Sequence, residues 1–531
     1  MGRCRLLLIP FLLAGAARPG LQEEARPEAD ALRLGWPQLA GPCSSFQTVP
    51  MATPLIGDLS RARRLWESGC RDLGRAKGGS QAYRRVEQFT VEEFARMGSH
   101  PGNWAGPVVA EGMVFCASWR PCGDWVTVGG SKVRLDAEDI VVALDALTGK
   151  TRWLAAEPGG ILKGGGKRQG FQVGPVVHKG AVYSLGSTAR LFAHDAAAGR
   201  KLWVSDDHPA RAAEAKARQE ALAGLAEGKW KYNLTPNWCS SLAVAQGVLI
   251  VPDQAGGLVG VDLEKGRKQW SAPGVIARWA TPSVWRHEDR EYVLCANEKG
   301  ELRLIEPVTG KELWRLAGLG PNWFTLAPGR DHVLVNVVAD SGGGGRGSER
   351  KPGRLGAVRL SPSGGERAWL VGDGFEHSLP VWMDSGARIR VLYRGGRFLV
   401  PNCWQGRGSA AEGVEGPAGG TALLIEEATG KVLSRLAAAE TWNEQLSGLA
   451  YWCGDHVLAR ADSYHGPKHG GRHPWTLWSV AGDAITRLPG RMDLVEFTNG
   501  YEVTMEAPLV AGLLFERTEQ GGIVCCDLRA P

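Results

Sequence analysis

The chain has 531 residues, enough for several domains or for one large repeat architecture. Its 73 glycines are about twice the usual share, and it also contains 21 tryptophans. The formal net charge is only +6, from 62 basic and 56 acidic residues. No block of lysine and arginine stands out, so a typical nucleic-acid-binding surface is excluded.

The first twenty residues have the pattern of a secretory signal peptide. Arg3 and Arg5 form a short basic region, and an apolar run from Leu6 to Ala17 follows. This run is too short to span a membrane, and no other window approaches the ~18 apolar residues that a span requires. Ala16 stands where a lipoprotein signal would need cysteine. We therefore expect a secreted, periplasmic or extracellular protein without a transmembrane or lipid anchor.

The cysteines show neither zinc-ligand nor haem-attachment spacing. Cys116 and Cys122 flank an Arg-Pro turn, and they either form a disulfide bond in an oxidising compartment or remain free. Cys525 and Cys526 are adjacent on a predicted strand, so their side chains point to opposite faces. This favours two buried thiols over a strained disulfide bond between neighbours.

Residues 21–100 form an N-terminal segment ahead of the repeats. Residues 21–57 are rich in proline, alanine and glycine and show little periodicity. Trp66 follows on a short strand-like or helical run. A capping-box pattern within residues 84–97 predicts a helix there.

From residue 101 to residue 531 the chain repeats a meander of short strands. Residues 174–203 are the cleanest copy, with four β-prone runs separated by glycine and aspartate turns. One meander cannot bury both of its faces, so several copies are needed. A closing tryptophan recurs roughly every 50 residues, which is the period of propeller blades. The copies end at Trp153, Trp203, Trp270, Trp314 and Trp369.

The later copies are less regular. Ser434 stands where the sixth copy would carry its tryptophan, and the seventh copy is degenerate. The eighth copy lacks a closing strand, which would leave an exposed edge unless the strand of Trp66 fills the position. Residues 209–228 are rich in alanine and charged residues and predict one inserted helix. The prediction is an all-β, eight-bladed propeller of four-stranded antiparallel blades, closed by the N-terminal strand; seven blades are the alternative.

The turn before each tryptophan resembles a known repeat. Residues 143–153, ALDALTGKTRW, match the AxDxxTGKxxW pattern of pyrroloquinoline-quinone (PQQ)-type β-propeller repeats at every fixed position. Quinoprotein alcohol dehydrogenases carry this repeat, and so does the non-catalytic propeller of an outer-membrane-protein assembly lipoprotein. The strings WPQLAGP and GGIVCCDLR also resemble secreted PQQ-like proteins of planctomycete and verrucomicrobial genomes. The resemblance implies the fold and leaves the activity open.

The loops that lead from each outer strand to the next inner strand share an unusual composition. These loops, here called the mouth loops, lie on one face of a propeller, around the central channel. Four of them pair asparagine with tryptophan and a fifth pairs arginine with tryptophan, which suits stacking and hydrogen bonding to a ligand. The alternative is that the tryptophans plug the channel and the asparagines cap turns. The predicted ligand-binding residues are Asn103, Trp104, Asn237, Trp238, Arg278, Trp279, Asn322, Trp323, His377, Trp442 and Asn443.

Three functions are compatible with these features. The expected one is a monomeric, non-catalytic binding or scaffold protein of the cell envelope, which takes a protein, peptide or glycan at the mouth and needs no metal. The second is a dehydrogenase dependent on PQQ and Ca²⁺, which needs oxygen ligands and an aspartate base; its catalytic residues are not recognisable. A hydrolase or lyase is suggested only by His465, His469 and His473, and the glycines and Pro467 between them exclude the helix that would align them.

Overall fold

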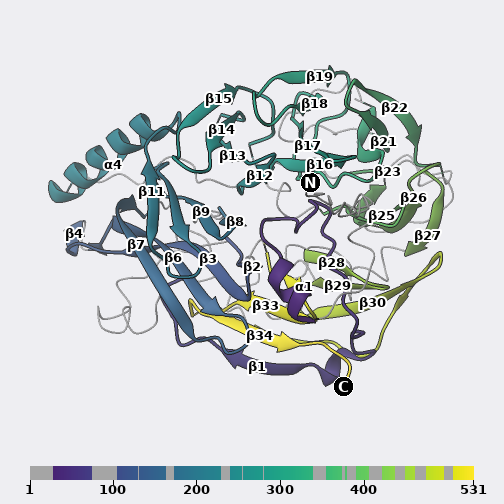
Figure 1. Ribbon diagram of the computed structural model, residues 1–531, viewed down its shortest axis with the longest axis horizontal. Coiled ribbons are helices and arrows are strands. Elements are labelled where there is room, and N and C mark those ends of the chain that lie inside the picture. The colour runs from purple at the N-terminus through teal and green to yellow at the C-terminus, as the bar shows by residue number, and fades with distance from the viewer. Residues whose placement is uncertain are drawn as a thin grey trace, which may run out of the picture.

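In the computed structural model the sheets stand side by side in a ring (Figure 1). The structure describes residues 28–73, 105–128, 131–162, 173–228, 240–253, 255–278, 280–338, 354–372, 377–379, 390–405, 421–436, 449–460, 474–495, 506–518 and 520–531. Eight antiparallel sheets form eight blades, as the repeat predicted. In each of the first four blades the first strand of the meander lies nearest the centre of the ring (Figure 1).

The first four blades have four strands each, in chain order. Blade 1 consists of β2 (Val108–Ala110), β3 (Met113–Pro121), β6 (Asp136–Asp145) and β7 (Thr151–Ile161). Blade 2 consists of β8 (Val176–His178), β9 (Ala181–Leu185), β10 (Leu191–Asp195) and β11 (Lys201–Ser205). Blade 3 consists of β12 (Ala243–Ala245), β13 (Val248–Pro252), β14 (Leu258–Asp262) and β15 (Lys268–Ala272). Blade 4 consists of β16 (Ser283–His287), β17 (Arg290–Ala296), β18 (Leu302–Ile305) and β19 (Glu312–Leu316).

The other four blades depart from this plan in part. Blade 5 has β20 (His332–Val338), β21 (Arg354–Ser361) and β22 (Gly364–Leu370), and a single bridge between Pro328 and Val333 stands for its inner strand. Blade 6 has β24 (Leu392–Arg394), β25 (Arg397–Gln405), β26 (Thr421–Glu426) and β27 (Val432–Leu436), and β23 (His377–Ser378) adds to β25. Blade 7 has β28 (Leu449–Cys453), β29 (His456–Arg460), β30 (Trp475–Ala481) and β31 (Ala484–Arg487). Blade 8 has β32 (Leu509–Val510), β33 (Leu513–Arg517), β34 (Ile523–Asp527) and β1 (Arg63–Glu67).

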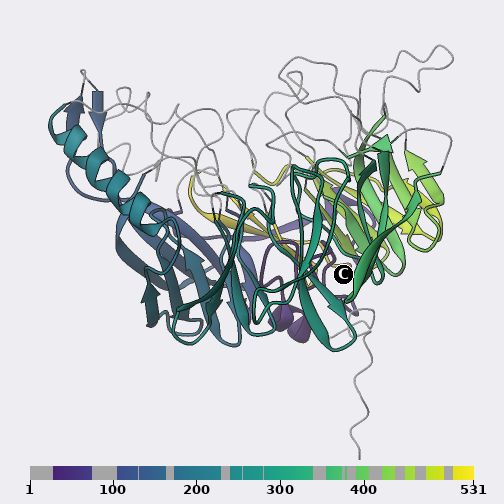
Figure 2. The same cartoon turned by 90° about the horizontal axis from the view of Figure 1, so that it is seen from above.

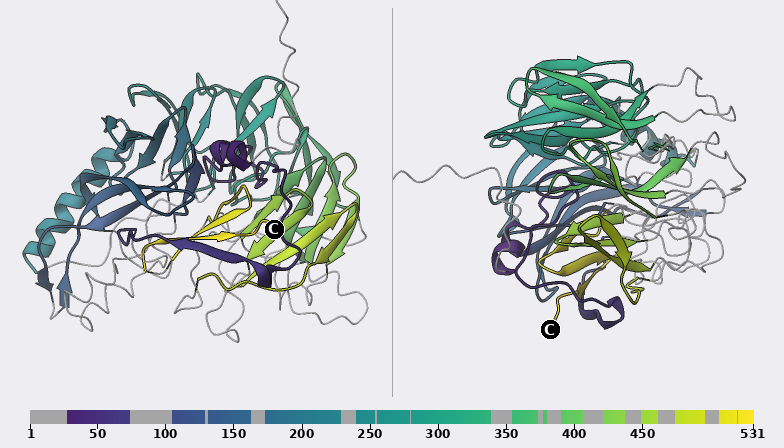
Figure 3. Two further views of the ribbon diagram at one scale, coloured as in Figure 1. Left: turned by 60° about the horizontal axis from the view of Figure 1, so that its bottom comes forward. Right: turned by 90° about the vertical axis from the view of Figure 1, so that its right-hand side faces the viewer.

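The N-terminal strand closes the ring, which confirms the prediction made from the incomplete eighth repeat. β1 pairs antiparallel with β34 (Figure 3). In this pairing Trp66 lies opposite Cys525. A short 3-10 helix, η1 (Leu59–Arg61), leads into β1, and the Asp58 side chain accepts a hydrogen bond from the Ser60 N–H at its start. The pairing covers the outer edge of β34, which would otherwise be open to further strands.

The closing tryptophans join each blade to the next one. The Trp153 indole N–H donates to the Ala196 carbonyl at 2.9 Å, and its ring lies so close to Gly199 that a Cβ there would stand 2.5 Å from it. Gly199 also has a φ of +67°, so the turn needs glycine for its conformation and for the tryptophan. We call this arrangement the tryptophan lock. The other locks are Trp66 on Gly149, Trp203 on Gly266, Trp270 on Gly310, Trp314 on Gly365 and Trp369 on Gly430.

An N-terminal strap, residues 36–56, runs across the face of the ring opposite the mouth loops. Trp36 pairs with Val109 of blade 1, and the Pro37 carbonyl accepts a hydrogen bond from the Val177 N–H of blade 2 at 2.8 Å. The strap then meets later blades in chain order. Its successive backbone partners are Val109, Val177, Val244, Val284, Tyr393, Trp452 and Leu528.

The sequence predicted little structure for this region, and the difference has a physical reason. The strap is held by hydrogen bonds to blades 1–4 and 6–8 rather than by its own periodicity. Helix α1 (Glu28–Leu34), also absent from the sequence-based prediction, precedes it and lies on the same face (Figures 2 and 3). This end of the central channel is therefore covered by the chain itself.

Blade 1 carries a projection on the mouth side. Its strands β3, β6 and β7 have 9, 10 and 11 residues, about twice the length of the strands in blade 2. Between β3 and β6 the chain forms the hairpin β4 (Val126–Val128) and β5 (Ser131–Val133), and helix α4 (Arg211–Ala226) lies on its flank. We call residues 122–136 together with α4 the wing. Figure 2 shows it rising above the ring on the side away from α1. Helix α4 confirms the insertion predicted for residues 209–228.

The structure also answers the open questions about cysteine. Cys116 and Cys122 are both free, so of the two states that the sequence left open the structure has the one without a disulfide bond. Cys525 and Cys526 are free and buried, as expected for neighbours on a strand. The helix predicted within residues 84–97 lies outside the described residues.

Candidate functional site

Four of the predicted ligand-binding residues fall within the described part of the chain. Arg278 is exposed, and its backbone carbonyl accepts a hydrogen bond from Ser240 Oγ at 3.0 Å. Trp323 is half-buried against the core of blades 3 and 4. His377 begins β23, opposite Gln405 of β25. These residues come from three different mouth loops. Asn103, Trp104, Asn237, Trp238, Trp279, Trp442 and Asn443 lie outside the described residues.

The fourth residue, Asn322, is fully buried and serves its own loop. Its Nδ2 donates to the Gly320 carbonyl at 2.8 Å, and its Oδ1 accepts from the Asn336 N–H at 3.4 Å. An amide used in this way satisfies buried backbone groups and is not presented to a ligand. Asn322 therefore fits the turn-capping alternative that the sequence left open.

A chain of hydroxyl groups joins neighbouring blades where the inner strands begin. The Gly174 N–H donates to Ser241 Oγ at 3.1 Å, and the Ser241 N–H donates to Thr281 Oγ1 at 2.9 Å. The Thr281 N–H continues the chain to Thr325 Oγ1 at 3.0 Å. The three hydroxyl side chains are buried, so they fix the blades to one another below the mouth loops.

A buried ion pair joins blade 8 to the segment that enters blade 6. Arg390 Nη1 lies 3.3 Å from Glu506 Oε1, and their side chains are 1% and 3% exposed. Phe46 of the strap and Tyr451 of β28 pack against the guanidinium, with Cζ 4.6 Å and 5.1 Å from their ring centroids. Burial raises the pKa of Glu506, against the opposing attraction of Arg390. The sequence did not predict this ion pair. The one available indication was that each of the two charged residues stands beside apolar residues.

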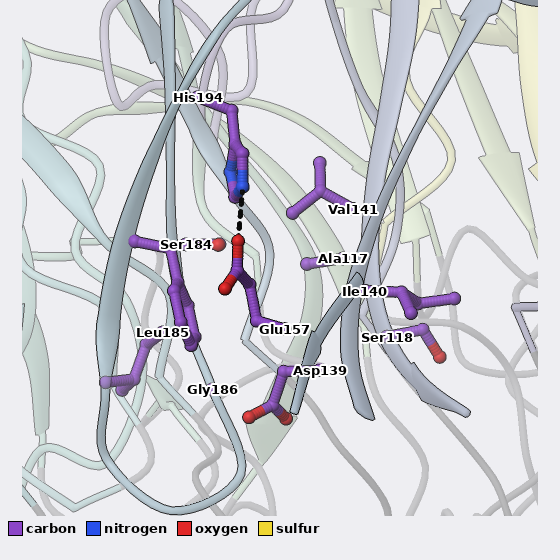
Figure 4. Close-up of a pocket in the computed structure, with 11 residues that line it drawn as sticks. Ala117, Ser118, Asp139, Ile140, Val141, Glu157, Ser184, Leu185, Gly186 and His194 are labelled. Atoms are coloured by element: carbon purple, nitrogen blue, oxygen red, sulfur yellow. Dashed lines mark hydrogen bonds and ion pairs between the residues drawn. The ribbon is translucent and has the colours of Figure 1, made fainter. Parts of the chain in front are cut away.

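A small pocket lies between blades 1 and 2 (Figure 4). Asp139 and Glu157 are cross-strand neighbours on β6 and β7, and both side chains are buried. His194 on β10 reaches across from blade 2, with Nε2 3.3 Å from Glu157 Oε1. Lys201 Nζ lies 2.9 Å from the other oxygen of Glu157. The Asp139 carboxylate accepts the Ser187 N–H at 2.8 Å.

The size and charge of this pocket limit what it does. Its volume is about 10 Å³, near the smallest space that holds one water molecule, so an organic ligand is excluded. Burial lowers the pKa of His194, although Glu157 opposes the shift, and a neutral imidazole is favoured. The pocket is therefore a polar junction between two blades. Sequence reasoning missed it, because its residues are spread over β6, β7 and β10.

The described residues do not fit the cofactors that quinoprotein dehydrogenases require. They contain no group of three or more His, Cys, Asp or Glu side chains placed to hold a metal ion. Asn322, the one asparagine among the predicted ligand-binding residues that is described, uses its side chain in its own loop. Glu506 is committed to Arg390. We derive no step through PQQ or Ca²⁺ from these residues. Within the same residues no helix is long and apolar enough to cross a membrane.

Comparisons with known proteins agree with the ring and its repeat. A family model described as the outer membrane protein assembly factor BamB matches residues 62–273 and 226–322. None of the curated protein sequences matches the chain. The solved quinohemoprotein alcohol dehydrogenase ADHIIG from Pseudomonas putida HK5 is 11% identical, with a TM-score of 0.50 over 97% of this chain and 83% of that one. BamB from Moraxella catarrhalis is 12% identical, with a TM-score of 0.43 over 78% and 98%.

At 11% identity the dehydrogenase structure shows the fold alone. The family assignment depends on the matched repeat, which contains the tryptophan locks of blades 1–4. It also agrees with the eight antiparallel blades and their closure by β1. Residues 62–322 belong to the family of PQQ-like β-propeller repeats, and the ring of blades continues the same architecture to the end of the chain.

Proposed function

We propose that the protein is a non-catalytic binding or scaffold protein of the cell envelope whose partner site lies on the mouth face. One observation carries the proposal: the strap and α1 cover the opposite face, with hydrogen bonds to blades 1–4 and 6–8. The mouth face instead carries the loops that connect successive blades, and loops of this kind are where rigid scaffolds usually carry their binding residues. A ring covered on one face and bearing connecting loops on the other fits a protein that binds from one side.

The expected partner is a protein, peptide or glycan, and the expected location is the periplasm or the cell exterior. The signal-peptide pattern of residues 1–20 supports the location. The pairing of Asn or Arg with Trp in the mouth loops supports a surface that stacks and donates hydrogen bonds. Arg278 and Trp323 are the two such residues whose side chains the structure describes at this face.

Site-specific photo-crosslinking tests the proposal. A photoreactive amino acid is placed at position 238 of a mouth loop or at position 179 of a turn on the strap face, and each protein is irradiated with envelope fractions. We expect adducts from position 238 that Trp279→Ala weakens, and none from position 179. Equal labelling from both faces, or labelling from position 179 alone, would contradict the mouth as the binding face.

The alternative is a dehydrogenase that uses PQQ and Ca²⁺, and a separate measurement distinguishes it. Purified protein is mixed with PQQ and CaCl₂, and quinone absorbance, melting temperature and alcohol-dependent dye reduction are followed. A binding protein is expected to show no turnover under these conditions. Saturable stabilisation by PQQ together with alcohol-dependent turnover would replace the first proposal with the second.

A further inference from the structure

Arg134, at the base of the wing hairpin, differs from its neighbours in having no anionic partner among the residues that the structure describes. Its Cζ lies 4.7 Å from the Trp125 ring centroid, and its Nε is buried without a hydrogen-bond acceptor. Nearby arginines of the described chain are paired: Arg120 Nη2 lies 2.8 Å from Glu138 Oε2, and Arg218 pairs with Asp136. Burial lowers the pKa of Arg134, as expected for a cation that has lost water without gaining a counter-charge.

The hairpin beside Arg134 has unpaired edges. β4 and β5 form a two-stranded sheet that no third strand joins within the described residues. A two-stranded hairpin alone is marginal in stability, and its outer edges can accept another strand. An added strand would receive main-chain hydrogen bonds from the hairpin, and its side chains would alternate between the two faces.

We propose that the wing binds an extended acidic peptide, which adds as a strand to hairpin β4–β5 and places an Asp or Glu carboxylate on the guanidinium of Arg134. The Trp125 ring holds the guanidinium, which suits a bidentate pair with a carboxylate. The proposal rests on the proposed function in that a partner is bound, and it adds a contact on the wing beside the mouth loops.

A protein segment fits this surface better than a nucleic acid does. Nucleic-acid binding depends on several cations that neutralise successive phosphates. Here the neighbouring cations Arg120, Arg218 and Arg211 already pair with carboxylates of the same chain. In the described part of the chain, one guanidinium without a carboxylate partner lies beside a strand edge that no other strand joins, and this matches a single side-chain carboxylate on an extended backbone.

Fluorescence anisotropy with two blocked, labelled decapeptides tests the proposal on the full-length protein. The probes are alternating Val-Glu and alternating Val-Gln, so that they differ in charge and share β-propensity. We expect saturable binding of the Val-Glu peptide, about tenfold tighter than that of the Val-Gln peptide. Arg134→Gln should reduce the affinity for the Val-Glu peptide to that for the Val-Gln peptide. Arg134→Lys should restore only part of it, because a lysine does not form the bidentate pair.

Arg152→Gln is the matched control, because Arg152 is an exposed arginine of the same blade that already pairs with Asp145. Its affinity for the Val-Glu peptide should equal that of the wild type. Equal binding of both peptides, no saturable binding of either, or an Arg134→Gln protein that melts normally and binds as before would overturn the proposal. Tighter binding of tripolyphosphate than of the Val-Glu peptide would assign the site to phosphate instead.

The crosslinking experiment separates this site from the mouth. If Arg134→Gln leaves the crosslinks from position 238 unchanged and the Val-Glu peptide also binds it normally, the wing site fails and the proposed function stands. If position 238 gives no specific adduct and the Val-Glu peptide still requires Arg134, the mouth site fails and the wing site stands.

Discussion

The seams between the blades are not all closed in the same way. Six seams, from that between blades 8 and 1 to that between blades 5 and 6, have a tryptophan lock. At the seam between blades 6 and 7, Ser434 occupies the tryptophan position, and its hydroxyl accepts from the Ile485 N–H at 3.4 Å. At the seam between blades 7 and 8, Arg460 pairs with Glu516, and both side chains are 1% exposed.

The difference shows that apolar packing and a buried ion pair can both hold the blades of one ring together, with different responses to substitution. A tryptophan lock combines apolar burial with one hydrogen bond, and it involves only adjacent blades. The Arg460–Glu516 pair is fully desolvated, so each charge depends on the other, and the Trp475 indole N–H also donates to Glu516 at 2.9 Å. Regular seams should lose stability in proportion to the apolar area removed, whereas the charged seam should fail when one partner is removed.

The largest expected effect is that of Arg460→Met. The substitution keeps an apolar side chain in place but leaves Glu516 buried beside Trp475 without its counter-charge. We expect the free energy of unfolding to fall by about 4 kcal/mol, as measured by urea denaturation. The double variant Arg460→Met with Glu516→Leu should recover most of this loss. Equal losses in the single and double variants would show that packing volume, not charge, holds this seam.

The next largest effect is expected from Trp203→Ala in the regular part of the ring. The ring of Trp203 packs on Gly266, and its indole N–H donates to the Leu263 carbonyl at 2.8 Å. We expect a loss of about 3 kcal/mol, the low end for truncation of a tryptophan, because the side chain is only half-buried. Urea denaturation provides the measurement, with Trp203→Phe as the control that keeps part of the packing. An unchanged unfolding midpoint would show that this tryptophan lock does not stabilise the fold.

Gly266→Ala tests the same tryptophan lock through the glycine on which the Trp203 ring packs. Gly266 has a φ of +67°, and a Cβ at this position would lie 2.6 Å from the Trp203 ring. The backbone strain and the displaced ring should together cost about 2 kcal/mol in thermal or urea unfolding. Gly180→Ala is the matched control, since Gly180 has a φ of +75° and no atom within contact of its added Cβ. A similar loss in both variants would assign the effect to backbone strain alone.

The two kinds of seam also explain how far the sequence could predict the structure. The lock tryptophans recur roughly every 50 residues at the end of a similar meander, so a single sequence predicted the blades, the N-terminal closure by β1 and the insertion of α4. The ion pairs Arg390–Glu506 and Arg460–Glu516 join residues that are 116 and 56 positions apart in different repeats, and no local pattern marks such partners. The strap was missed for the same reason, because distant blades hold it.

The candidate site was predicted less well than the fold. The composition of the mouth loops predicted which face of the ring binds a ligand, but not which residues contact it. It did not distinguish Asn322, whose side chain hydrogen-bonds within its own loop, from exposed residues such as Arg278. That no described carboxylate pairs with Arg134 depends on which carboxylates the folded chain brings to its neighbours instead. A sequence lists charges, whereas the pairing of those charges is a property of the tertiary structure.

A smaller, pH-dependent effect is expected at the polar junction within the regular seams. His194 faces Glu157 and Lys201 and packs near the rings of Trp153 and Phe192. Burial lowers its pKa below 6.5 in the folded protein, so protonation favours the unfolded chain. The stability that His194 contributes should be complete above pH 6.5 and should be lost as the pH falls through the folded-state pKa. Wild type and His194→Gln are compared by thermal melts at several pH values, and a constant difference between them would contradict this.

The smallest effect is expected for Ser434→Ala, at the seam where the tryptophan is missing. Among the described residues, the only hydrogen bond from the Ser434 hydroxyl to blade 7 is the long one from the Ile485 N–H, and the side chain is half-buried. Because a neutral hydrogen bond of this kind contributes little, the loss should be below about 1 kcal/mol in urea denaturation. A loss as large as that of Trp203→Ala would show that this seam is held at the tryptophan position after all. A small loss would mean that blade 7 is held from its other side, by Arg460 and Glu516.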